Sequence, residues 1–225
     1  MKARVLLCLL LVGCSTFEVA DEYTLADQSL RKRIDMTDGT VSVGFEPAMR
    51  FSSFGAWGLP VVPSLEHPDP GKEIVLVVGL ALEQHHEFSL PASVCVEDES
   101  HVRLCSEQAL VNARIIRREG SHYNNMAKLP YDPHRPFYMP ITLESGATAI
   151  GSEVIYSLYA YNGEPRWDHF SMDLLYRFRC QSACPSEATL KLDGLVSVDG
   201  VALTGPDLLF HRVRAKHYRP LVAPQ

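Results

Sequence analysis

The sequence predicts an all-β protein, an antiparallel β-sandwich of immunoglobulin-like or jelly-roll arrangement with little helix. Apolar and polar residues alternate in about eight to ten short segments, which is the pattern of half-buried strands. Glycine, proline and Asp-Gly turn signals separate these segments, and none of them shows a long helical period. The Cys…Trp…Cys arrangement of antibody domains is missing from the sequence, so we predict the architecture and not that family.

The first expected strands lie before the middle of the chain. Residues 40–47, TVSVGFEP, alternate apolar and polar side chains and predict a strand with one inward face. Residues 51–73 carry four prolines and three glycines and predict a long irregular loop. Residues 73–84, EIVLVVGLALEQ, are apolar and rich in β-branched types, so they predict a well-buried strand.

Four cysteines outside the first sixteen residues predict two disulfides. In SVCVEDESHVRLCSE, two short strands flank a polar turn and would place Cys95 opposite Cys105. Cys180 and Cys184 would then close the small loop CQSAC. Zinc is the alternative, but the two pairs lack the C-x2-C spacing of zinc ribbons, whereas an even number of cysteines in an exported chain favours disulfides.

The segments after this hairpin are less uniform. Residues 109–120, ALVNARIIRREG, fit either a strand or a short helix. Residues 152–163, SEVIYSLYAYNG, carry apolar or aromatic side chains at both odd and even positions, so they predict an interior strand. Residues 171–180, SMDLLYRFRC, predict another strand.

The clearest local pattern is near the C-terminus. In residues 195–205, the dipeptide Asp199-Gly200 lies between two alternating segments, and it suits the positive φ angles of a two-residue type I′ turn. Residues 207–218, DLLFHRVRAKHY, then predict a last strand.

The first sixteen residues predict export. Lys2 and Arg4 precede the apolar run Val5–Val12, which is too short for the roughly twenty residues of a membrane span and has the length of a signal h-region. The run ends in Leu-Val-Gly-Cys at residues 11–14, which resembles the lipobox of bacterial lipoproteins. The resemblance implies cleavage by signal peptidase II before Cys14 and a diacylglyceryl group on its sulfur. A plain secretory signal, or an apolar first helix with an incidental cysteine, is the alternative.

The resemblance implies a lipid-anchored protein of the bacterial cell envelope. Each buried methylene contributes about 0.8 kcal/mol, so two or three acyl chains hold a protein on a membrane. Ser15, in place of an aspartate, is compatible with export to the outer membrane. We therefore expect a signal peptide at 1–13, a lipidated tether at 14–38 and a β-sandwich at 39–225. An alternative divides the sandwich into two β-domains near 121–136.

The net charge and the absence of common catalytic motifs argue against several classes of function. Loss of residues 1–13 would change the formal net charge from −6 to −8, and an acidic body is a poor ligand for nucleic acid. The sequence contains no G-x-S-x-G, P-loop or H-E-x-x-H motif. His85-His86-Glu87 is the nearest approach to a metal cluster, but adjacent histidines on a strand point to opposite faces. We therefore predict no catalytic residue, metal or cofactor.

Two aromatic loops could stack on a sugar. Trp57 lies in FSSFGAWGLP, and Trp167 and Asp168 lie in YNGEPRWDHF beside Glu164. These residues predict a site that binds or cleaves carbohydrate or peptidoglycan, with Glu164 and Asp168 as the conceivable acid pair. The alternative is that both tryptophans cover the ends of the sandwich.

A third loop, SHYNNMAKLPYDPHRP at 121–136, is long and proline-rich, and loops of this length are often functional. Its hydrogen-bonding side chains are of the kinds found at protein interfaces: Tyr123, Asn124, Asn125, Tyr131, His134 and Arg135. The preferred interpretation is a non-enzymatic lipoprotein that binds another envelope protein, as an accessory subunit of an envelope machine or an immunity-type protein. The carbohydrate module is the alternative.

Overall fold

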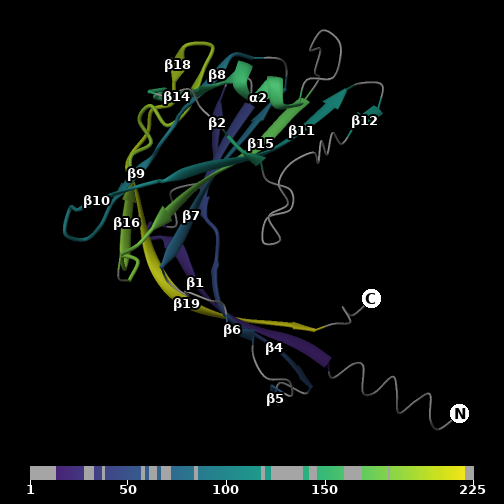
Figure 1. Ribbon diagram of the computed structural model, residues 1–225, viewed down its shortest axis with the longest axis vertical. Helices are drawn as coiled ribbons and strands as arrows, with labels where there is room; N and C mark the ends of the chain where they lie inside the picture. The colour runs from purple at the N-terminus through teal and green to yellow at the C-terminus, as the bar shows by residue number, and fades with distance from the viewer. Residues whose placement is uncertain are drawn as a thin grey trace, which may run out of the picture.

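The fold is all-β, as the sequence predicts, and its strands form antiparallel sheets (Figure 1). The computed structural model describes residues 14–27, 33–36, 39–56, 59–60, 65–66, 72–83, 86–117, 120–122, 139–141, 146–159, 169–181 and 183–220. The one helix among these residues, α2 (Ser152–Tyr159), packs beside the sheets and is too short to span a membrane.

The first sheet is eight-stranded. Its order is β10 (Arg103–Cys105), β9 (Cys95–Glu97), β16 (Glu187–Leu190), β19 (Leu208–Pro220), β1 (Cys14–Leu25), β4 (Ala48–Ala56) and β5 (Leu59–Pro60), with β6 (Leu65–Glu66) also on β4. The first described strand, β1, therefore lies between β4 and the last strand, β19.

Two further sheets complete the sandwich. The seven-stranded sheet has the order β12 (Gly120–His122), β11 (Gln108–Arg117), β15 (His169–Arg179), β7 (Glu73–Leu82), β3 (Gly39–Phe45) and β2 (Arg33–Met36), and β13 (Met139–Pro140) pairs with β11. The four-stranded sheet has the order β14 (Ala149–Gly151), β8 (Phe88–Pro91), β17 (Ser197–Val198) and β18 (Val201–Ala202). β15 pairs with β7 and with β11, so strands on both sides of residues 121–136 share one sheet and the suggested division there does not separate them.

The core lies between the sheets and follows strand alternation. Every second residue of β7 is buried in it: Ile74, Leu76, Val78, Leu80 and Leu82. The eight-stranded sheet contributes buried side chains from four strands: Tyr23, Leu25, Val96, Leu190, Leu208 and Phe210. Burial of this apolar surface is the main stabilising term, at about 25 cal/mol per Å².

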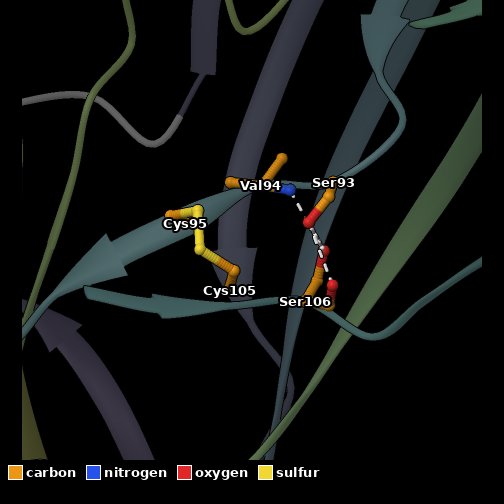
Figure 2. The surroundings of a disulfide bond; sticks show 5 residues. All are labelled: Ser93, Val94, Cys95, Cys105 and Ser106. Atoms are coloured by element: carbon orange, nitrogen blue, oxygen red, sulfur yellow. Dashed lines mark hydrogen bonds between the residues drawn. A yellow bond between two sulfur atoms is a disulfide. The ribbon is translucent and has the colours of Figure 1, made fainter. Parts of the chain in front are cut away.

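Both predicted disulfides are present. Cys105 is the Cα partner of Cys95 across β9 and β10, and Cys180 is bonded to Cys184. Figure 2 shows how the hairpin is closed behind the first bridge: Ser93 Oγ donates to the Ser106 carbonyl (2.9 Å), and the Val94 N–H donates to Ser106 Oγ (3.0 Å).

The predicted type I′ turn is also confirmed. Asp199 has a φ of 49° and Gly200 a φ of 77°, and the turn joins β17 to β18. Both central residues therefore adopt the positive φ that this dipeptide tolerates.

Three expectations are corrected by the structure. The tether expected at 14–38 contains β1 and β2, both of which are paired in sheets. The irregular loop expected at 51–73 begins inside β4, which continues to Ala56. The interior strand expected at 152–163 begins as α2, whose Ile155 is fully buried and whose Tyr156 ring contacts Phe88 and Phe170. Residues 109–120, which fit either element, lie mainly in β11.

Candidate functional site: the β1–β4–β19 arm

Three strands of the eight-stranded sheet continue beyond the body of the sandwich and form a projecting arm (Figure 1). We define the arm as residues 14–21 of β1, 48–56 of β4 and 212–220 of β19. In its ladder Ser15 pairs with Pro220, and Cys14 pairs with Ala56. Cys14 is therefore an element of the sheet at the tip of the arm, with no flexible linker between it and the fold.

The base of the arm is held by the core. Tyr23 and Phe210 are buried, and the Phe45 ring lies between them, with centroid distances of 4.9 Å to each. The Phe45 and Phe210 rings meet edge to face, a favoured geometry for aromatic pairs.

A buried acid is neutralised where the arm leaves the core. Asp21 is only 3 % exposed, and its carboxylate lies 3.5 Å from Arg212 Nε and 3.8 Å from Arg214 Nε. An unpaired charge at such a position would be strongly destabilising, so the two arginines explain why an aspartate is tolerated inside β1.

The loop closed by Cys180 and Cys184 is fixed to the same place. The Tyr23 hydroxyl donates to the Pro185 carbonyl (2.6 Å), and the Arg212 guanidinium donates to the Cys184 carbonyl. Burial raises the pKa of Tyr23 to about 12, against a smaller opposing effect of Arg212. The hydroxyl therefore remains protonated, and able to donate, across the physiological pH range.

Beyond this point β19 becomes exposed. Val213 is 42 % exposed, and the Arg214 side chain is 62 % exposed. On the same face of the strand as Val213, His217 Nε2 lies 2.5 Å from Glu22 Oε1 of β1. The arm thus presents basic side chains and one large apolar side chain outside the core.

One edge of β19 is open along the arm. β16 pairs with Leu208–His211, and the Arg212 N–H donates to the Ser186 carbonyl (2.8 Å). Among the residues that the structure describes, no strand pairs with this edge from Val213 onward. An open edge of this kind is a template for a further strand.

The loops that the sequence singled out lie outside the described residues. This applies to Trp57, Trp167 and Asp168, and to the loop residues Tyr123, Asn124, Asn125, Tyr131, His134 and Arg135. β12 and β13, the described strands before and after these loop residues, both pair with β11.

A second polar cluster has a structural role. His86 Nδ1 lies 2.6 Å from Asp199 Oδ2, and Asp199 Oδ1 accepts the Glu87 N–H (3.0 Å). The Tyr156 hydroxyl donates to the His86 carbonyl (2.9 Å), and burial raises the pKa of Tyr156 to about 12. The His86 side chain is only 12 % exposed, and its contact with Asp199 fixes it against the turn.

The described residues contain no group of three or more His, Cys, Asp or Glu side chains arranged to hold a metal ion. The features that the sequence missed are the Asp21–arginine contacts and the open β19 edge. Both depend on pairing between segments nearly 200 residues apart; Glu22 and His217, for example, are separated by 195 positions.

Comparison with known proteins found no matching family model, no similar curated protein and no similar solved structure.

Proposed function

We propose that the chain is a non-enzymatic envelope lipoprotein that uses its arm to bind another envelope protein. The observation that carries this proposal is the arm itself, a strand ladder outside the core with an exposed valine and an open edge. Small sheets need an apolar face covered by other structure to be stable on their own. A partner that covers the arm would supply that contact.

The lipid anchor fits the same arrangement. In the proposal, Cys14 carries the lipid, and β1 begins at this residue. The part of β1 that belongs to the arm, residues 14–21, spans about 23 Å at about 3.3 Å per residue, so the arm would hold the sandwich away from the bilayer, in the periplasm or at the cell surface. The outer membrane is the proposed location, as Ser15 implies. The two disulfides support this proposal because they are compatible with an oxidising, extracytoplasmic compartment.

The test is mild detergent extraction of the native, lipidated protein followed by mass spectrometry of co-purifying proteins. We expect one envelope protein at a fixed ratio, and we expect Val213→Glu to lose it. Val201→Glu is the matched control, because Val201 is also exposed, at 68 %, but lies on β18 away from the arm. Cys14→Ser should release the protein from the membrane or leave it unprocessed.

Two results would contradict the proposal. A protein that purifies alone from native membranes would remove the binding function and favour a glycan screen directed at Trp57 and Trp167. A partner that is lost only when residues 121–136 are replaced, and kept in Val213→Glu, would move the binding site from the arm to that loop.

A further inference from the structure

The orientation of the β19 backbone shows which groups its open edge presents. The Arg212 N–H faces β16, where it donates to the Ser186 carbonyl, and the Leu209 carbonyl faces β1, where it accepts the Ala26 N–H. Backbone groups alternate along a strand, so the N–H and C=O groups of Arg214 and Lys216 face away from β1. Among the described residues they have no strand beside them.

The side chains along this edge define the charge of a suitable neighbour. Arg214 and Lys216 project from one face of β19, and Val213 and Ala215 from the other. β1, the neighbour on the closed side, sets Asp21 opposite Arg214 and Glu22 opposite Val213. The strand already accepts an acidic partner on one side.

A second copy of β19 is a poor occupant. Antiparallel self-pairing centred on Ala215 would place Arg214 of each copy directly opposite Lys216 of the other. Like charges directly opposite one another destabilise a strand pair. Basic edge residues are a common protection against this kind of self-association.

We propose that the open edge of β19 binds an extended segment of the partner by strand addition, an inference that rests on the proposed function. The segment carries acidic residues at alternate positions, opposite Arg214 and Lys216, and apolar or β-branched residues between them, opposite Val213 and Ala215. Backbone hydrogen bonds supply the affinity, and the alternating charges supply the register and the choice of partner.

The probe is a fluorescein-labelled peptide, TTVEVEVTT, titrated into the full-length protein in detergent at low salt and read by fluorescence anisotropy. The control peptide TTVVEEVTT has the same composition but places its two glutamates on opposite faces of the strand. We expect binding of the first peptide at least about tenfold tighter than of the second, together with slower hydrogen exchange at the Arg214 and Lys216 amides.

Two variants test the edge itself. Lys216→Pro removes an outward N–H and leaves the hydrogen bonds to β1 in place, so it should weaken peptide binding about tenfold. Lys216→Ala keeps the backbone and should weaken binding about threefold, whereas Lys191→Ala, at an exposed lysine on another strand boundary, should have no effect. Circular dichroism and thermal unfolding of Lys216→Pro establish that it folds.

Equal binding of the two peptides, or full binding by both Lys216 variants, would overturn the strand-addition proposal. So would a dimer that Lys216→Pro dissociates, because the occupant would then be a second copy. A native partner that is retained by Lys216→Pro would overturn the edge site and leave the proposed function standing. If the peptide binds but the native protein is extracted without any partner, the edge site would stand and the proposed function would fail.

Discussion

The hydroxyl of Tyr23 predicts a specific change in stability at alkaline pH. It donates to the Pro185 carbonyl at 2.6 Å, and its pKa is raised from 10.0 to about 12, chiefly by burial. A group with a raised pKa in the folded state contributes stability that is complete below pH 10. That stability is lost as the pH rises towards 12, because the unfolded chain releases its proton first.

The size of the effect follows from the two pKa values. At pH 11 a full two-unit difference would cost about 1.4 kcal/mol relative to neutral pH, and solvent near the hydroxyl reduces this to about 1 kcal/mol. At pH 7 the free energy of unfolding of Tyr23→Phe should be about 1 kcal/mol lower than that of the wild type, because the hydrogen bond is missing. Between pH 9 and pH 11, the free energy of unfolding of Tyr23→Phe should then fall by less than that of the wild type.

Urea unfolding followed by circular dichroism at pH 7, 9, 10 and 11 measures this difference. The other buried tyrosines are common to both proteins, including Tyr156 and Tyr176, whose pKa is also raised by burial. Their contributions therefore cancel. We expect the difference in free energy of unfolding between wild type and Tyr23→Phe to disappear by pH 11. A constant difference at all four pH values would refute the reasoning, because Tyr23 would then not be linked to folding through its ionisation.

Three other substitutions have expected magnitudes that urea unfolding at pH 7 can check. Replacing Cys95 and Cys105 together by alanine opens a bridge with a sequence separation of 10 and should cost about 2.7 kcal/mol; an unchanged midpoint would show that the hairpin is fixed without it. Gly200→Ala should cost about 1–2 kcal/mol because Gly200 has a φ of 77°, and a neutral result would mean that the turn changes type. Phe210→Ala removes a fully buried ring at the base of the arm and should cost about 3–5 kcal/mol, so a loss below 1 kcal/mol would place that ring outside the core.

The sequence predicts the structure correctly where a few consecutive residues determine it. The Asp199-Gly200 turn and the Cys95–Cys105 hairpin each depend on a few consecutive residues, and both were predicted correctly. The β7 strand was equally clear, because its continuous apolar run is buried on both faces.

The errors occur where distant contacts override local preference. Residues 152–159 are rich in β-branched and aromatic types, which favour a strand. They form α2 instead, in which Ile155 is buried in the core and the Tyr156 ring packs against Phe88, so tertiary packing overrides the local preference. The sequence predicts a tether for β1 because residues 15–38 are polar and mixed in charge. The basic residues that pair with the acid of β1, Arg212 and Arg214, lie at the other end of the chain.

The position of β1 also sets the order in which the sheet can be completed. It pairs with β19 from Ser15 to Leu25, and Thr24 and His211, which meet in that ladder, are 187 residues apart. A chain emerges from the ribosome N-terminus first, so β1 is made early and its second neighbour is the last strand described. Pairings with such large sequence separation form slowly. A molecule cut short before β19 would leave β1 paired with β4 alone and β16 paired with β9 alone, so the three-stranded arm is present only on chains that have been made through β19.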